Sequence, residues 1–274
     1  MPVYRLKNLI LLILAIAVGF LLALVVPKQL ARTHAQQHLQ QQLDALFAGS
    51  NVTLDCNLPN GQKLSVIELQ SPDSYDELAE KLLGEGCCRD GDFSDPVRYV
   101  SENGTLEISG DGSFCAKLQN SPVSTNLEKS AASTLRQLGF SASQVLAPER
   151  LQAGVFAVCC RQSVLSMPIF SDGLTLCYTN NRLSEISGTY YQNTAGALRV
   201  GDEKSISCAD ALLALRSRLD ELGWVGSRIT AVTQGFRRID SASAAIRLAP
   251  YWKIDTDTGS FFVSGIGGEV FQID

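Results

Sequence analysis

The sequence predicts an α+β fold with a single amino-terminal transmembrane helix, followed by tandem units in which a helix packs on an antiparallel sheet. Three observations support this prediction. Residues 9–26 form an uninterrupted apolar run, and three later segments have the apolar spacing and terminal signals of amphipathic helices. After each of those helices come short strand-like runs separated by turn residues.

The apolar run from Leu9 to Val26 contains no charged or polar side chain. As a helix it would be roughly 27 Å long, which matches the hydrocarbon thickness of a bilayer. No small-residue cleavage site ends it, so we expect an uncleaved signal anchor and not a removed signal peptide. The arrangement predicts a plasma-membrane protein that crosses once, with a short cytoplasmic tail and a large extracytoplasmic domain.

Small residues recur along one face of this predicted membrane helix. Ala15, Gly19 and Ala23 follow one another at four-residue steps. Such a face lets a second helix approach closely, so these residues are the candidate helix-packing site. Alanine and glycine are also common in membrane helices, and the spacing fits an ordinary membrane helix equally well.

The rest of the chain divides at glycine- and serine-containing segments. Residues after Pro27 have no glycine or proline until Gly49, and their apolar positions recur at helical spacing. The predicted organisation is a tail (1–8), a transmembrane helix (9–26), a juxtamembrane helical stalk (27–49) and three α+β units (50–120, 121–200 and 201–274).

Each α+β unit is expected to begin its folded core with one helix. The spacing predicts helices over 74–84, 127–138 and 208–222, and each has a candidate amino-terminal cap. The predicted cap pairs are Ser74 with Glu77, Thr125 with Glu128, and Ser207 with Asp210. Asn103-Gly104 and Asp111-Gly112 are strong hairpin signals between the strands that follow the first helix.

Eight cysteines are the most unusual feature of the composition. They are Cys56, Cys87, Cys88, Cys115, Cys159, Cys160, Cys177 and Cys208. No Cys-x-x-Cys spacing occurs, so neither a thioredoxin-like site nor a zinc ribbon is indicated. Buried free thiols, structural disulfides, and metal or redox chemistry all remain open interpretations.

Histidine is absent from the whole predicted globular region. The two histidines, His34 and His38, lie on the predicted stalk at an i, i+4 spacing that can bind a metal on one helix face. No carboxylate lies nearby, so a solvated stalk is the favoured interpretation. The absence of histidine elsewhere excludes Ser-His-Asp and Cys-His catalysis. We therefore expect a protein that is not an enzyme, with no catalytic, cofactor-binding or metal-binding residues and no evident small-molecule substrate.

Charge argues against one further class of partner. All 28 acidic residues lie beyond the apolar run, and the chain has a net charge of −5 with no basic cluster. An acidic protein of this kind is not expected to bind nucleic acid.

The carboxy-terminal sequence resembles the end of PepSY-like domains. The resemblance rests on Pro250-Tyr251-Trp252-Lys253-Ile254-Asp255-Thr256, then Thr258-Gly259-Ser260-Phe261-Phe262-Val263-Ser264, then Gly267-Gly268-Glu269-Val270. With the anchor and the tandem units, which would be PepSY/cystatin-like, the whole chain resembles the YycH/YycI-type regulatory proteins of Gram-positive bacteria.

This resemblance implies an extracytoplasmic accessory protein in two-component system regulation. Its expected partners are the membrane and a sensor histidine kinase of cell-envelope control, or a sister single-pass regulator, bound through protein–protein contact. The family supplies no catalytic residues to carry over. Two alternatives remain: an envelope module that inhibits a peptidase or binds wall components, and a thiol redox sensor.

Overall fold

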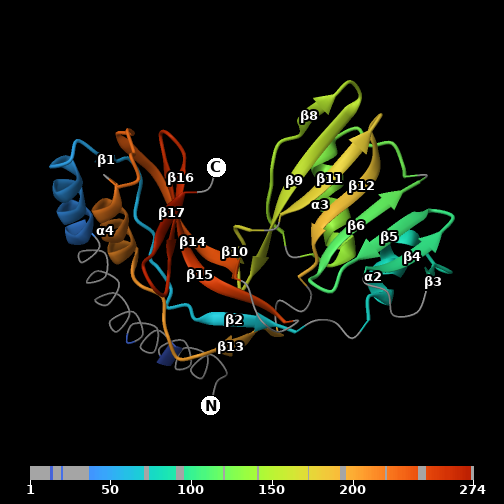
Figure 1. The fold of residues 1–274 in the computed structure, drawn as a ribbon, viewed down its shortest axis with the longest axis horizontal. Helices are drawn as coiled ribbons and strands as arrows, with labels where there is room; N and C mark the ends of the chain where they lie inside the picture. Colours follow the sequence, from blue (N-terminus) through green and yellow to red (C-terminus); the bar gives the residue numbers. More distant parts are fainter. Residues whose placement is uncertain are drawn as a thin grey trace, which may run out of the picture.

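Two largely antiparallel sheets, one of ten strands and one of seven, form the body of the protein (Figure 1). The structure, a computed structural model, describes residues 37–70, 74–90, 96–119, 121–140, 142–171, 173–191, 196–219, 221–239 and 245–272, together with Ile13, Leu14 and Phe20.

The ten-stranded sheet is built from the middle of the chain. Its path runs β10-β9-β11-β12-β6-β5-β4-β3, and β7 and β8 also pair with β9. The strands are β3 (Cys88–Asp90), β4 (Val97–Ser101), β5 (Gly104–Ile108), β6 (Ser113–Leu118), β7 (Ala142–Val145), β8 (Glu149–Gln152), β9 (Val155–Val164), β10 (Met167–Pro168), β11 (Leu174–Thr179) and β12 (Arg182–Thr189). Helices α2 (Asp76–Leu83) and α3 (Leu127–Leu138) pack on one face of this sheet.

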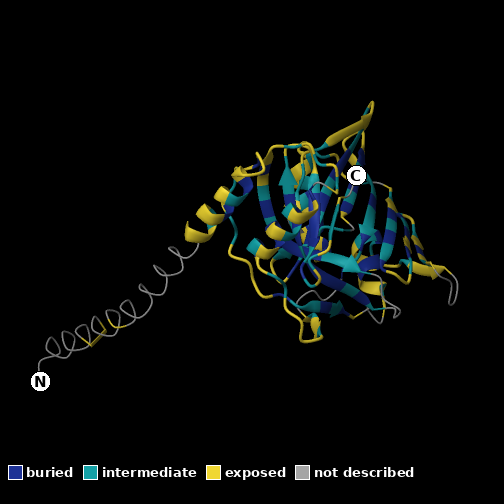
Figure 2. Ribbon diagram, turned by 60° about the vertical axis from the view of Figure 1, so that its left-hand side comes forward, coloured by how far each residue is buried: buried dark blue, intermediate teal, exposed yellow. Residues whose placement is uncertain are grey.

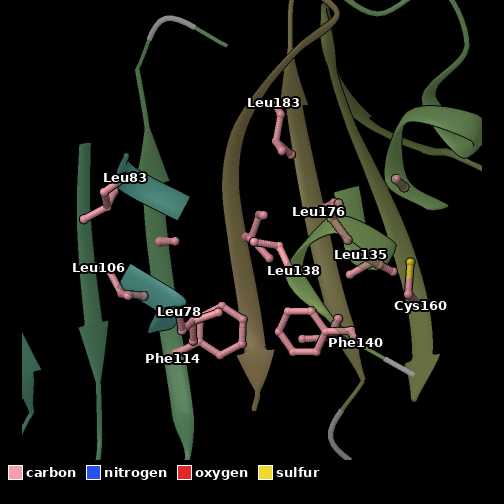
Figure 3. Close-up of a cluster of buried hydrophobic side chains, with 14 of the residues drawn as sticks. Leu78, Leu83, Leu106, Phe114, Leu135, Leu138, Phe140, Cys160, Leu176 and Leu183 are labelled. Carbon is pink, nitrogen blue, oxygen red and sulfur yellow. The ribbon is translucent and has the colours of Figure 1, made fainter. Parts of the chain in front are cut away.

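The packing of α2 and α3 follows from their apolar spacing. Leu78 and Leu83 of α2 and Leu135 and Leu138 of α3 project into one cluster with the sheet residues Leu106, Phe114 and Leu176 (Figure 3). Burying a leucine side chain stabilises a fold by roughly 1.5–3 kcal/mol. Phe140, just after α3, stacks on Phe114 with ring centroids 6.0 Å apart. The cluster therefore fixes both helices against a single sheet.

The seven-stranded sheet combines the two ends of the described chain. Its path is β1-β14-β15-β16-β17, and β2 pairs with both β13 and β15. The strands are β1 (Thr53–Leu54), β2 (Val66–Leu69), β13 (Leu198–Val200), β14 (Arg228–Ile239), β15 (Ile246–Thr256), β16 (Ser260–Ser264) and β17 (Val270–Gln272). Helix α4 (Cys208–Arg218) and helical residues 37–48 cover one face through a second cluster that includes Phe47, Leu215 and Trp252.

A third apolar cluster joins the two sheets. It contains Val164 and Ile169 from the end of the ten-stranded sheet and Ile67, Phe236 and Leu248 from the seven-stranded sheet. The Phe170 amide donates to the Phe236 carbonyl at 2.8 Å, next to a parallel bridge between Ile169 and Phe236. Figure 2 shows the buried residues concentrated in the strands of both sheets, whereas the outer sides of the helices are exposed.

The fold class predicted from the sequence is wrong. Most of the regular structure is β-strand in two sheets, instead of a tandem of PepSY/cystatin-like helix-on-sheet units behind a transmembrane helix. Two pairings account for the difference. Strand β12 pairs with β6, which merges the strands that follow α2 with those that follow α3 into one sheet. Strands β1 and β2, from the early part of the chain, pair with β14 and β15 near its end.

The predicted single-pass signal anchor is corrected as well. In the ranges that the structure describes, no helix is both long enough and apolar enough to cross a membrane. The predicted anchor itself, residues 9–26, lies outside those ranges except for Ile13, Leu14 and Phe20. The plasma-membrane location stays a prediction.

Two of the three predicted helix caps are also wrong. Helix α2 begins at Asp76 without a side-chain cap, and Ser74 instead accepts a hydrogen bond from the Asp76 amide at 3.0 Å. Helix α3 is capped by Asn126, whose side chain accepts from the Lys129 amide at 2.9 Å. At α3 the neighbouring Asn126 takes the role expected of Thr125, whereas α2 has no side-chain cap. The Ser207 and Asp210 capping box of α4 is confirmed.

Candidate functional site

The best-defined pocket of the described residues lies on the helix-covered side of the seven-stranded sheet. It has a volume of about 760 Å³ and lies between helical residues 37–48, the segment 57–63 and the start of α4. Uncharged amides and hydroxyls dominate its lining: Gln37, Gln40, Gln41, Asn57, Asn60, Gln62, Ser205 and Ser207. Lys63 is the single charged side chain among the lining residues. We call this site the amide pocket.

One wall of the amide pocket is the helix over residues 37–48. Its apolar side, with Leu43 and Phe47, is buried in the cluster beneath α4. Because of this packing, Gln40 points toward the chain that follows β1. The Gln40 side chain donates to the Cys56 carbonyl and accepts from the Leu58 amide, both at 3.4 Å. A glutamine side chain thus pairs with main-chain groups of an extended segment at this wall.

A second glutamine, Gln234, hydrogen-bonds another part of the same segment. Gln234 of β14 is only 6% exposed, and its side chain needs polar partners there. Its Oε1 accepts from the Gln62 amide at 2.7 Å, and its Nε2 donates to the Gln62 carbonyl at 2.8 Å. The Ser205 hydroxyl also donates to the Gln62 carbonyl, at 3.0 Å. Side chains therefore make hydrogen bonds to the backbone of the segment 57–63 that the backbone of a neighbouring strand would make in a sheet.

Trp252 is fully buried against the segment 57–63. Its indole Nε1 donates to the Ile206 carbonyl at 3.1 Å, which anchors the chain just before α4. Gly61 crosses above the ring, and a Cβ atom there would lie 2.7 Å from the indole. Only glycine at position 61 allows the main chain to come this close to the indole ring.

Helix α4 closes the third side, and its first turn is already capped. The Ser207 hydroxyl oxygen accepts from the Asp210 amide at 3.2 Å, and the Asp210 carboxylate accepts from the Ser207 amide at 3.2 Å. This reciprocal pairing satisfies donors that would otherwise face the pocket. The carboxylate also offsets the positive end of the helix dipole. The arrangement favours a neutral ligand over an anion.

The side chains that line the amide pocket offer hydrogen-bonding groups and one ammonium group, that of Lys63. No carboxylate or histidine is among its lining residues. The Cys208 thiol lines it, but burial raises its pKa to about 12, so the thiol stays protonated at neutral pH. In the described part of the chain, no group of three or more histidine, cysteine, aspartate or glutamate side chains is arranged to hold a metal ion.

The helix-packing residues proposed from the sequence belong to the predicted membrane helix. Ala15, Gly19, Ala23 and His34 lie outside the described residues. His38 is exposed on the helix over 37–48 and does not line the pocket. All eight cysteines are free thiols, and only Cys160 and Cys208 are buried.

Sequence reasoning missed the glutamines that build the pocket. The glutamine-rich stretch around residues 36–42 was a visible signal. A run of uncharged polar side chains that can hydrogen-bond to one another is unusual on a solvated helix. Gln234 gave no such signal. It lies in a strand, and its partner Gln62 is 172 residues away in the sequence.

Comparisons with known proteins give similarities of fold only. No family model matches the chain, and no curated protein matches it. Among solved structures, it is similar to an uncharacterized protein from Eubacterium rectale, with 11% identity and a TM-score of 0.49 over 81% of this chain and 90% of that one. It is also similar to the Bacillus megaterium YpeB C-terminal domain, with 11% identity and a TM-score of 0.41 over 78% of this chain and 100% of that one.

At these identities and TM-scores, neither structure indicates what the chain binds or does. The YycH/YycI-type family is not among these matches, and that assignment stays a prediction.

Proposed function

We propose that the protein is a non-enzymatic regulator that binds an extended polypeptide segment of a partner in the amide pocket. The observation that carries this proposal is the way the pocket already binds backbone. Gln234 pairs with both the amide and the carbonyl of Gln62, and Gln40 pairs with the chain at Cys56 and Leu58. An amide side chain offers one acceptor and two donors, which matches the alternating groups of a peptide backbone.

Further amides remain for a ligand. Among the described residues, the side chains of Gln37, Gln41 and Asn57 line the pocket without a hydrogen-bond partner. The apolar side chains of Leu39, Leu58, Pro59, Ile206 and Ala209 lie between the polar ones. The volume of about 760 Å³ is within the usual range for a ligand site.

The partner class follows from the resemblance to YycH/YycI-type proteins. In this proposal the segment belongs to a sensor histidine kinase of cell-envelope control or to a sister regulator, and binding changes the activity of that partner. The net negative charge of the chain and the absence of carboxylate and histidine side chains from the pocket lining support protein–protein contact over catalysis.

Site-specific photo-crosslinking tests this proposal. A benzophenone amino acid replaces Gln41, inside the pocket, and in a matched chain it replaces Val123, which is 58% exposed and belongs to the part of the chain that forms the ten-stranded sheet. Crosslinking is carried out in native membranes and the products are identified by mass spectrometry. We expect a partner peptide at position 41 and none at position 123.

Competition and substitution sharpen the result. The double change Gln37→Ala and Gln41→Ala removes two hydrogen-bonding groups, each worth about 0.5–1.5 kcal/mol, and should weaken binding of the identified peptide about tenfold. Equal crosslinking at both positions, or none at position 41, would contradict the pocket. An envelope peptidase or wall glycan crosslinked at position 41 would keep the pocket but contradict the kinase partner.

A further inference from the structure

Four aromatic side chains gather on the face of the seven-stranded sheet that points away from α4. The Phe262 ring lies 5.6 Å from the Phe170 ring and 6.0 Å from the Phe271 ring, measured between centroids. Tyr251 joins them, with its ring 5.7 Å from that of Phe271. Because side chains alternate between the two faces of a strand, Tyr251 lies on the opposite face from Trp252, which is buried beneath α4. We call this group the aromatic patch.

The aromatic patch is only partly covered. Phe262 is 6% exposed, whereas Phe170, Tyr251 and Phe271 are half-buried. Helix α4 and helical residues 37–48 pack on the other face of the sheet, and Figure 1 shows α4 on one side of β14, β15 and β16. The patch therefore presents ring surface on the side of the sheet that those helices leave uncovered.

The Arg237 side chain of β14 lies over these rings. Its Cζ atom is 4.7 Å from the centroid of Phe271, 5.5 Å from that of Phe262 and 6.0 Å from that of Tyr251. Cation–π attraction of this kind orients a guanidinium group. A guanidinium carries five N–H donors in a fixed fork, and among the described residues none of them has a hydrogen-bond or ion-pair partner. Arg237 is thus positioned by the rings with its donors still available.

The other charged groups on this face are already paired. Lys253 and Asp255 alternate with the buried positions of β15 and so share the face of Tyr251. The Lys253 ammonium donates to the Asp255 carboxylate at 2.5 Å, and the Ser260 hydroxyl donates to the same oxygen at 2.5 Å. Arg237 therefore leaves a local positive charge on this face. A single carboxylate complements it, whereas the net charge of −5 opposes the approach of a polyanion.

The aromatic patch reaches a free edge of the sheet. Strand β17 ends the strand path and pairs with β16, and in the described part of the chain no strand pairs with its outer side. An extended polypeptide can add a strand to such an edge, which places its alternate side chains on one face. Phe271 is the middle residue of β17, and its ring is the one nearest the Arg237 guanidinium. A side chain of the added strand on this face would lie beside both groups.

We propose that the aromatic patch and the edge of β17 bind an extended acidic segment of a partner protein. An aspartate or glutamate side chain of that segment accepts hydrogen bonds from the Arg237 guanidinium. Apolar side chains two positions before and after it, on the same face of the segment, pack on Phe271 and Tyr251. The site lies on the opposite face of the sheet from the amide pocket, so the inference does not rest on the function proposed for that pocket.

Selection from a peptide library tests the proposal without assuming the sequence of the segment. Random heptapeptides displayed on phage are selected on the full chain in detergent micelles and, in parallel, on the Arg237→Gln chain. We expect the parent chain to enrich peptides with an acidic residue flanked by apolar residues at two-residue spacing. Fluorescence anisotropy then measures binding of a selected, dye-labelled peptide. Its affinity should fall about tenfold in Arg237→Gln, because hydrogen bonds between charged groups are lost.

Matched variants make the result specific. Arg228→Gln changes an exposed arginine at the start of the same strand and should leave the affinity unchanged. Arg237→Lys keeps the charge but not the fork of donors and should give an intermediate affinity. The double change Gln37→Ala and Gln41→Ala alters the amide pocket only and should have no effect, which separates this site from that pocket. Thermal unfolding checks that each variant is folded.

A change in the peptide gives a readout that does not depend on any variant of the chain. Replacing the acidic residue of the selected peptide by its amide should weaken binding to the parent chain about as much as Arg237→Gln does. Failure to enrich any peptide, enrichment of peptides without carboxylates, or equal affinity in Arg237→Gln would overturn the proposal. Self-association of the parent chain that Arg237→Gln abolishes would assign this face to a second copy instead and would also overturn it.

Discussion

The two sheets cover their helix-packed faces differently, and the amide pocket lies beside the covered face of the seven-stranded sheet. On the ten-stranded sheet, α2 and α3 contact each other and meet the strands through an apolar cluster. On the seven-stranded sheet, the segment 57–63 runs between α4 and the helix over 37–48 and crosses the face of the sheet at Trp252. A segment without regular structure brings unpaired main-chain groups into a covered face, and these groups need partners.

The partners explain why the pocket has its composition. Gln234 lies in β14, which packs against an apolar cluster. Its side-chain amide hydrogen-bonds both the main-chain amide and the carbonyl of Gln62. The comparison shows that the side-chain amides near the point where the segment 57–63 crosses the sheet mainly bind that segment. Gln37 and Gln41, whose side chains do not bond this segment, line the amide pocket.

The largest expected effect tests whether the two helix-covered faces have separate roles. Leu135→Ala in α3 and Leu215→Ala in α4 each remove a side chain with no exposed surface. Each should lower the free energy of unfolding by about 2–5 kcal/mol, because each leaves a cavity in its cluster. Urea unfolding measures this loss, and binding of the crosslinked partner peptide is measured on the same variants.

Only Leu215→Ala should also weaken binding, because α4 forms a wall of the amide pocket and α3 does not. An equal loss of binding in both variants, with both still folded, would mean that the two sheets act as one unit.

An intermediate effect is expected where the sheets join. A Cβ atom at Gly235 would lie 2.4 Å from the Pro168 carbonyl oxygen and 2.7 Å from the Phe170 ring. Because one of these contacts is with main chain, Gly235→Ala must shift the junction and should cost about 1–3 kcal/mol of unfolding free energy. Gly267→Ala is the matched control, since its nearest neighbours are 3.8 Å away. Thermal unfolding of both variants separates them, and an equal Tm would show that the junction is not tightly packed.

The smallest effect concerns an ion pair across the same junction. Asp111, in the hairpin between β5 and β6, lies 3.7 Å from Arg238 of β14. Hydrogen bonds from the Ser113 hydroxyl and amide, and the charge of Arg238, lower the pKa of Asp111 below its ordinary value of 3.8. A carboxylate with a lowered pKa stabilises the fold above its unfolded pKa, and this contribution is lost as pH falls through the folded pKa.

Asp111→Asn should therefore be less stable than the parent chain by about 0–1 kcal/mol at neutral pH, because the pair is exposed. The difference should stay constant down to about pH 5 and shrink below about pH 4. Urea unfolding at several pH values measures it. A difference that grows on acidification would contradict the ion-pair role.

Local features of the chain were predictable from neighbouring residues. The helix over 127–138 begins and ends where its apolar spacing indicates, and the Ser207 and Asp210 box caps α4. Asn103-Gly104 and Asp111-Gly112 mark the two hairpins of β4, β5 and β6. The capping residue was less predictable, because Asn126 and not Thr125 caps α3.

Pro250 shows where local reasoning reached its limit. A proline has no amide hydrogen to donate to a neighbouring strand, so it is unusual inside a paired strand. The structure has one continuous strand, β15, because Pro250 lies where the neighbour of β15 changes from β2 to β16. Its carbonyl accepts from the Gly265 amide at 2.8 Å, so the missing amide falls in the gap between those neighbours.

The sequence by itself determined the turns, the helices and the polar character of the segment around Gln40, because these depend on residues within a few positions of each other. The tertiary structure alone decided that β6 joins β12 and that Gln62 meets Gln234. Each of these contacts joins residues more than 60 positions apart. Such contacts depend on which apolar faces are buried together, and side-chain periodicity specifies a face but not its partner.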